Sequence, residues 1–206
     1  MTRGVRYAWA AGLVLLAAGG GTAAAEVAVG SAAPAFTLTD AEGASHSLSE
    51  FADKWVVLEW FNRDCPFVRK HYGSGNMQRL QVSYTGRGVA WLTIASSAPG
   101  KQGYLTPDDA RQVIAEFGTG QTALLLDPDG TVGRRYGAKT TPHMFIIDPQ
   151  GIVIYAGAID DRPSVDPANI PGATNYVQQA LEAALAGRPV PVAETTSYGC
   201  SVKYAD

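Results

Sequence analysis

The feature that most constrains the fold is an apolar run that ends a few residues before a cysteine. Residues 55–61 form a nearly continuous apolar run of strand length, which is typical of a strand covered by helices on both faces. Three polar residues break the run, and Cys65 and Pro66 follow. Proline suits the first helical position, because its φ is fixed and its missing N–H costs nothing there. We therefore expect a central strand, then a helix with Cys65 at its N-terminus.

The rest of the chain alternates strand and helix patterns. A turn at residues 40–43 separates residues 35–38 from 47–51, which predicts a short hairpin ahead of the main sheet. The order that follows predicts one α/β sandwich domain with a mixed central sheet flanked by helices, covering residues 26–187. Further strands are expected at residues 89–94, 123–126, 144–147 and 152–156, and helices at 66–84 (interrupted at Gly73 and Gly75), 106–117 and 175–185.

The N-terminus has the pattern of a secretory signal peptide. Arg3 and Arg6 precede an uncharged apolar run over residues 7–18, and alanines at 23–25 offer a cleavage site before Glu26. The run is short for the roughly 20 residues of a spanning helix. We expect residues 1–25 to be removed, with export across an inner membrane to a periplasm and no stable membrane insertion afterwards.

Charge and composition exclude several function classes. The formal net charge is −3 and becomes −5 without Arg3 and Arg6, so the chain lacks the basic stripe of a nucleic-acid-binding protein. The glycines at 73 and 75 have neither the lysine nor the spacing of a phosphate-binding loop, so no cofactor is expected. The charge at Lys70 is expected to be solvated, and those at residues 160–162 are expected to be solvated or paired loop charges.

The chain has two cysteines, Cys65 and Cys200. Both lie in the expected exported part, where thiols meet an oxidising environment. Cys200 lies in a proline-rich tail, residues 188–206, that is expected to run over the surface and is long enough to reach another site. A structural disulfide and a redox role are both consistent with this count.

Two segments carry a resemblance to a known family. They are residues 60–68, WFNRDCPFV, and residues 140–148, TTPHMFIID, followed by a turn that ends at Gly151. With them the chain resembles, over about residues 30–158, the thioredoxin-fold redoxins, and most closely the peroxiredoxin-like proteins of the AhpC/TSA type with one cysteine after the first core strand. The resemblance implies a thioredoxin-like sandwich.

The resemblance also implies roles for individual residues. Cys65 is expected to act as a thiolate, stabilised by the helix N-terminus. Thr141 and Pro142 are expected to form a cis peptide bond beside Cys65 and to position an extended substrate. Asn62 and His143 are auxiliary candidates. A cycle of this type needs a resolving thiol, and Cys200 is the internal candidate, through a disulfide within or between chains.

Departures from the family patterns leave the reaction open. Val68 stands where a thioredoxin has its second cysteine, and Asn62 and Pro142 stand where typical peroxiredoxins have a threonine or serine and an arginine. Two enzymatic interpretations remain, reduction of peroxides or of disulfides, each regenerated by a thiol reductant. A third is a redox-inactive binding or metal-delivery protein that uses Cys65, His71, His143 and Cys200, since sulfur and imidazole suit copper or zinc.

Overall fold

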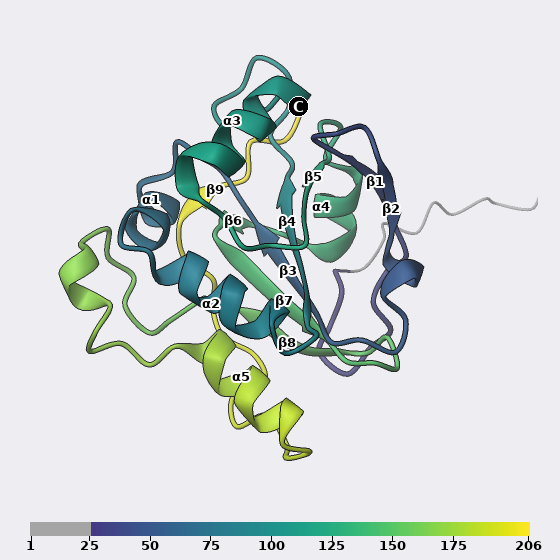
Figure 1. Ribbon diagram of the computed structural model, residues 1–206, viewed down its shortest axis with the longest axis vertical. Coiled ribbons are helices and arrows are strands. Elements are labelled where there is room, and N and C mark those ends of the chain that lie inside the picture. The colour runs from purple at the N-terminus through teal and green to yellow at the C-terminus, as the bar shows by residue number, and fades with distance from the viewer. Residues whose placement is uncertain (1–25) are drawn as a thin grey trace, which may run out of the picture.

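The computed structural model describes residues 26–206; the expected signal peptide and its cleavage site lie outside them. A mixed sheet of seven strands runs through the centre, and helices cover both of its faces (Figure 1). The strands are β1 Thr37–Asp40, β2 Ser45–Ser47, β3 Val56–Trp60, β4 Ala90–Ala95, β5 Ala123–Leu126, β6 Thr140–Thr141, β7 His143–Ile147, β8 Val153–Gly157 and β9 Cys200–Ser201. The helices are α1 Pro66–Gly73, α2 Asn76–Thr85, α3 Pro107–Phe117, α4 Thr131–Tyr136 and α5 Tyr176–Leu185, with 3-10 turns at Leu48–Phe51 and Pro167–Asn169.

The strand order confirms the thioredoxin-like α/β class. The order in the main sheet is β2-β1-β5-β4-β3-β7-β8. Strands β5, β4 and β3 are parallel, β7 is antiparallel to β3, and β8 closes this edge as a hairpin with β7. The N-terminal hairpin forms as expected, but β1 also pairs with β5, so it extends the main sheet. The return strand was expected over residues 47–51, but it forms earlier, as β2 Ser45–Ser47, and Leu48–Phe51 is a 3-10 turn.

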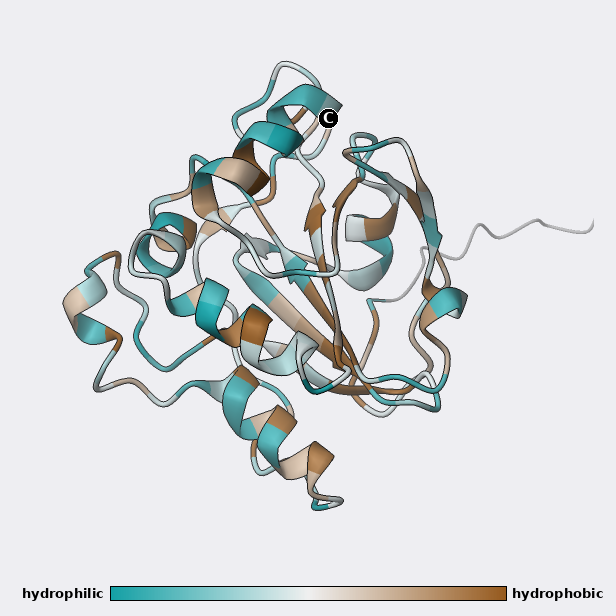
Figure 2. Cartoon of the chain, in the orientation of Figure 1, coloured by the Kyte–Doolittle hydropathy of each residue, from teal (hydrophilic) through white to brown (hydrophobic). Residues whose placement is uncertain are grey.

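Side chains on opposite faces of the sheet build two core layers, since successive strand residues point to opposite faces. Helices α1, α2, α3 and α5 pack on one layer, which includes Val57, Phe61 and Cys65. Helix α4 packs on the other, which includes Leu58 and Trp60. Figure 2 shows the hydrophobic colour concentrated along the central strands. Strand β3 is buried at every position, which confirms its predicted central place.

Local sequence signals set the ends of the helices near Cys65. Pro66 is the first residue of α1 and Cys65 is its N-cap. The helix expected over residues 66–84 divides in two as predicted: α1 ends at Gly73, and Gly75, with φ +71°, caps the start of α2. A positive φ is open to glycine at no steric cost, so Gly75 allows the chain to turn between the two helices.

The C-terminal tail is more ordered than an irregular surface segment. Strand β9 pairs antiparallel with β6, and earlier in the tail the backbones of Thr195 and Ala156 hydrogen bond at 3.1 Å. Beyond β9, the Tyr204 hydroxyl donates to the carbonyl of Ala138 at 2.8 Å. Figure 1 shows the tail, in yellow, passing between α1 and α3. Within residues 26–206, no helix has the length and apolarity to cross a membrane.

Candidate active site

Cys65 lies where β3 gives way to α1, and its side chain is fully buried. Its backbone N–H donates to the carbonyl of Asn62 at 3.1 Å, which closes the tight turn between strand and helix. The protonated thiol donates to the carbonyl of Thr141, with Sγ and O 3.0 Å apart. The two segments that carried the resemblance therefore meet at this sulfur.

The surroundings of Cys65 favour its thiolate. Burial alone would raise the pKa of the Cys65 thiol. Hydrogen bonding to the thiolate by Cys200, by the side chain of Thr141 and by the backbone N–H of Val68 outweighs burial, so the pKa lies below its usual value. Val68 lies in the first turn of α1, so part of this effect comes from the exposed N–H groups of the helix N-terminus. A lowered pKa raises the fraction of the nucleophilic form at neutral pH.

Cys200 lies directly beside Cys65. Cys200 pairs with Thr141 in the β6–β9 ladder, and the carbonyl of Thr141 accepts from the Cys65 thiol, so the two cysteines flank the same residue. Burial, hydrogen bonding to the Cys65 thiolate and the charge of that thiolate raise the pKa of Cys200 to about 11, while the ammonium group of Lys203 lowers it. Both cysteines are free thiols in this state. The structure thus places a thiol with a lowered pKa, Cys65, beside a thiol with a raised pKa, Cys200.

The other predicted site residues divide into two groups. Thr141 and Pro142 are joined by a cis peptide bond, and Thr141 contacts both cysteines. Asn62 is fully buried and shapes the approach to Cys65: its Oδ1 accepts from the N–H of Asp64 at 2.9 Å, and its Nδ2 donates to the carbonyl of Gln102 at 3.3 Å. Asn62 therefore contacts the backbone of two loops.

His143 lies away from the cysteines. It follows the alternation of β7, so it shares the face of Phe145, whose ring centroid is 4.6 Å from that of His143, and not the face that holds Cys65. Its Nδ1 accepts from the N–H of Lys139 at 3.2 Å. Burial lowers the pKa of His143 to about 4. The histidine lines a separate cavity of about 640 Å³ under the tail.

The metal-delivery interpretation gains no support from these positions. His71 hydrogen bonds through Nδ1 to Asn76 at 2.9 Å and its Nε2 lies 3.8 Å from Asp160. Burial lowers the pKa of His71 to about 4. In the part of the chain that the structure describes, no three His, Cys, Asp or Glu side chains are grouped so that they could hold a metal ion.

Glu59 is a buried acid that our sequence interpretation passed over. It lies on β3 inside the apolar run, six positions before Cys65, and accepts hydrogen bonds from Tyr72 and from the indole of Trp91, both at 2.9 Å. Burial raises the pKa of Glu59 to about 7, although the hydrogen bonds oppose this rise. A charged residue interrupting a fully buried strand was the available signal.

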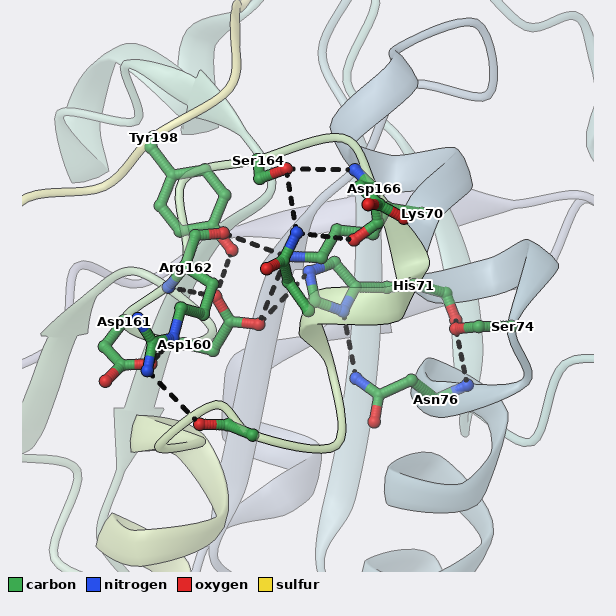
Figure 3. Close-up of polar contacts among 12 residues, drawn as sticks. Lys70, His71, Ser74, Asn76, Asp160, Asp161, Arg162, Ser164, Asp166 and Tyr198 are labelled. Carbon is green, nitrogen blue, oxygen red and sulfur yellow. Dashed lines mark hydrogen bonds and ion pairs between the residues drawn. The ribbon is translucent and has the colours of Figure 1, made fainter.

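A second polar cluster surrounds Asp160, next to the site (Figure 3). Lys70 and Asp160 are both buried, with Nζ and Oδ2 3.5 Å apart, and Lys70 also donates to the carbonyl of Arg162 at 2.9 Å. The hydroxyl of Tyr198 donates to Asp160, and its ring packs on Phe67 with centroids 5.7 Å apart. The expectation of a solvated charge is therefore wrong for Lys70, because the tail and the loop after β8 enclose it, whereas Asp160 is one of the paired loop charges that were expected.

Comparisons with known proteins agree with this geometry. The AhpC/TSA family profile matches residues 29–156, more than half of the chain. A thiol-disulfide oxidoreductase, ResA, of Geobacillus thermodenitrificans is 31% identical over 127 residues, which cover 62% of this chain and 67% of the relative.

Two solved structures match over almost their whole length. An uncharacterized conserved protein of Geobacillus kaustophilus has a TM-score of 0.76 and 30% identity, and the match covers 86% of this chain and 93% of that one. A hypothetical protein of Sinorhizobium meliloti has a TM-score of 0.75 and 27% identity, with 88% and 97% covered. With a thioredoxin-like fold and an activated cysteine at the N-terminus of α1, this chain belongs to the AhpC/TSA family and is a thiol-dependent oxidoreductase.

Proposed function

We propose that this protein is an exported thiol–disulfide oxidoreductase in which Cys65 is the nucleophile and Cys200 is the resolving thiol of the same chain. The observation that carries the proposal is that both cysteines flank Thr141: the Cys65 thiol donates to its carbonyl at 3.0 Å, and Cys200 pairs with it across the β6–β9 ladder. The pKa of Cys65 is lowered and that of Cys200 is raised, each under the influence of the other. A nucleophile and a second thiol that occupy neighbouring places at one residue can form a disulfide without rearrangement of the central sheet.

The reaction is a two-step exchange that moves two electrons. The Cys65 thiolate attacks one sulfur of a substrate disulfide, forms a mixed disulfide and releases the other sulfur as a thiolate. The Cys200 thiolate then attacks Sγ of Cys65, forms the Cys65–Cys200 disulfide and releases the second substrate thiolate. The substrate gains two electrons, the two cysteines lose them, and the two cysteine protons end on the released thiols. An external thiol reductant restores the dithiol.

The pKa values give these steps their order. In the resting protein the thiolate of Cys65 holds the pKa of Cys200 high through its charge and its hydrogen bond, so Cys200 stays protonated. Once Cys65 is in a mixed disulfide, that charge and the acceptor are lost, and burial remains the one raising cause against the lowering effect of Lys203. The pKa of Cys200 then falls, which generates the second nucleophile only after the first step is complete.

Disulfide reduction suits the site better than peroxide reduction, which is the candidate that the family name favours. Peroxide reduction gains from donors that polarise the oxygen–oxygen bond, and Asn62 and Pro142 occupy the positions of the donors in typical peroxiredoxins. Asn62 is also engaged with two backbone groups. The Thr141 backbone beside Cys65 instead offers an edge to an extended, disulfide-bearing chain.

Location and domain limits are part of the proposal. The sequence of residues 1–25 supports export, and a periplasm is an oxidising compartment in which such a couple has substrates. Residues 26–187 form the redoxin domain in this proposal, and residues 188–206 form the tail that supplies Cys200. The substrate is a disulfide and the partner that restores the dithiol is a thiol reductant.

Stopped-flow oxidation of the fully reduced protein tests the choice of substrate. We expect a peptide disulfide to oxidise both cysteines rapidly, with Cys65→Ser as the unreactive control, and hydrogen peroxide to react no faster than with a free thiol. Mass spectrometry of the product should find a Cys65–Cys200 disulfide within one chain. A peroxide rate far above that of a free thiol, with a slow disulfide reaction, would reverse the assignment.

A further inference from the structure

The tail covers the part of the active site that a substrate must reach. Cys65 is fully buried, and β9 pairs with β6 so that Thr141 faces Cys200 and Thr140 faces Ser201. An extended substrate that delivers a sulfur atom to Cys65 along the Thr141 edge needs the same backbone groups. The tail and such a substrate therefore exclude each other.

Residues 198–201, which we name the plug, have the form of a bound peptide. Gly199 has φ +142°, and a Cβ there would lie 2.1 Å from the carbonyl oxygen of Thr141, so the chain passes Thr141 too closely for any side chain. Tyr198 lies two residues before Cys200, packs against Phe67 in an edge-to-face arrangement and donates to Asp160. Three consecutive residues thus each occupy a defined place at the site: Tyr198 at Phe67 and Asp160, Gly199 at the Thr141 carbonyl, and Cys200 opposite Thr141.

Tyr198 can move away without leaving the buried carboxylate of Asp160 unpaired. Apart from the Tyr198 hydroxyl, Asp160 keeps the N–H of Arg162 at 2.9 Å and the ammonium group of Lys70 at 3.5 Å. Loss of a buried charge partner is strongly destabilising, whereas loss of one of three donors is not. On either side of the plug, Thr195 and Val202 are tied to the backbones of Ala156 and Lys139. The plug can therefore open as a loop while the tail stays attached.

We propose that the plug is an intramolecular mimic of the substrate, that Tyr198 is its latch on Asp160, and that the protein acts on extended polypeptide segments with an aromatic residue two positions before the reactive cysteine. This inference rests on the proposed function and names its substrate class. Tyr198 is a positioning residue, because it acts on Cys65 only by holding Cys200 in place. A substrate with the same pattern replaces the plug at Thr141, Phe67 and Asp160.

Alkylation of Cys65 by iodoacetamide tests the latch without any substrate. The protein is the full chain with Cys200→Ser, so that one thiol reacts, with and without Tyr198→Phe, which keeps the ring on Phe67 and removes only the hydroxyl. The measured rate scales with the open fraction. We expect about a tenfold increase, the size of a lost hydrogen bond to a charged acceptor.

The matched control is Tyr84→Phe, which removes a tyrosine hydroxyl that donates to Glu182 at 2.9 Å, far along the chain from the tail. We expect it to leave the alkylation rate unchanged. The pH profile separates access from chemistry: opening of the latch raises the rate on the high-pH plateau, where Cys65 is fully ionised, whereas a change confined to the Cys65 pKa leaves that plateau unchanged. An unchanged rate in Tyr198→Phe, or a gain that is absent from the plateau, overturns the latch.

The substrate pattern is tested with peptides of the chain's own sequence 196–202, TSYGCSV, whose cysteine is joined by a disulfide to a coloured aromatic thiol. Attack by Cys65 of the Cys200→Ser protein gives a mixed disulfide and releases one coloured thiolate. We expect the tyrosine peptide to react several-fold faster than the same peptide with alanine in place of tyrosine. Equal rates overturn the pattern. The proposed function stands or falls separately, on whether the wild-type protein forms the Cys65–Cys200 disulfide.

Discussion

The two cysteines lie in regions of opposite character. Cys65 is fixed by the scaffold, at the junction of a fully buried central strand and a helix, and its thiol is completely buried. Cys200 lies in a two-residue strand of a tail, and its thiol is half-buried. The scaffold lowers the pKa of its cysteine and the tail keeps its own high. In the proposed function, the rigid scaffold supplies the nucleophile and the displaceable tail supplies the thiol that completes turnover.

The largest predicted effect separates the two cysteines directly. Cys65→Ser should reduce disulfide reduction by roughly a thousandfold or more, as expected when a covalent nucleophile is removed. Cys200→Ser should retain the first step and stop at the mixed disulfide. The measurement is single-turnover reaction with a peptide disulfide followed by intact mass. A Cys200→Ser protein that releases both substrate thiols as fast as the wild type contradicts the resolving role.

Glu59 tests the scaffold side. Its pKa is about 7 in the folded chain against an ordinary value of 4.5 for glutamate, so between these pH values the folded state holds a proton that the unfolded state has lost. The stability this brings is fully present below about pH 4.5 and is lost as the pH rises through about 7, a change of about 3 kcal/mol. Glu59→Gln should flatten this dependence in urea unfolding between these pH values.

The matched control for Glu59→Gln is Glu42→Gln, which changes an exposed carboxylate on the turn between β1 and β2. It should leave the slope of stability against pH as in the wild type. If Glu59→Gln and wild type have parallel curves, the buried acid does not hold its proton near neutral pH.

Gly199 tests the tail side. Gly199→Ala places a Cβ against the Thr141 carbonyl at a φ that suits glycine, and we expect it to cost about 1–3 kcal/mol of tail docking. Cys65 should then be alkylated faster and its pKa should rise, because the donors of Cys200 move away. Gly172→Ala is the control, since no atom lies within 4 Å of the added Cβ. Equal alkylation rates in Gly199→Ala and Gly172→Ala would show that the tail does not lie against Thr141 in solution.

The smallest effect concerns the second chemical step. The Lys203 ammonium group lowers the pKa of Cys200, so Lys203→Met should raise that pKa and slow resolution of the mixed disulfide by about threefold, the scale of a half-exposed charge interaction. The first step should be unaffected. Rapid quench with thiol trapping measures both steps, and Lys54→Met, at the opposite end of β3, is the control. If Lys203→Met slows the first step instead, Lys203 acts on the thiolate of Cys65 and not on Cys200.

The scaffold was more predictable from the sequence than the tail was. The position of Cys65 at a helix N-terminus follows from an apolar run, a break and a proline, all local signals, and the expected strands agree with β4, β5, β7 and β8 to within one or two residues. Helix α4 was not predicted, because six residues with an internal glycine give little periodicity. The thioredoxin-like class was correct.

The residues that surround Cys65 come from parts of the chain that are far apart in the sequence. The pairing of Thr141 with Cys200 joins positions 59 residues apart, and nothing in a proline-rich tail predicts its register. Lys70 was expected to be solvated because it looks like an ordinary helix charge, and Asp160 was expected to be a solvated or paired loop charge. The two form a buried pair, which Tyr198 of the tail helps to cover. Local sequence patterns therefore locate Cys65, whereas the residues packed around it can be identified only from the tertiary structure.

The most direct test of the account is a redox titration of the full chain in thiol–disulfide buffers, with free thiols alkylated and the disulfides mapped by non-reducing peptide analysis. The account predicts that Cys65 and Cys200 are lost together as a two-electron couple, with one intrachain Cys65–Cys200 disulfide as the product. If Cys65 oxidises while Cys200 remains free to alkylation, or if the two cysteines pair with different thiols, the central claim is wrong.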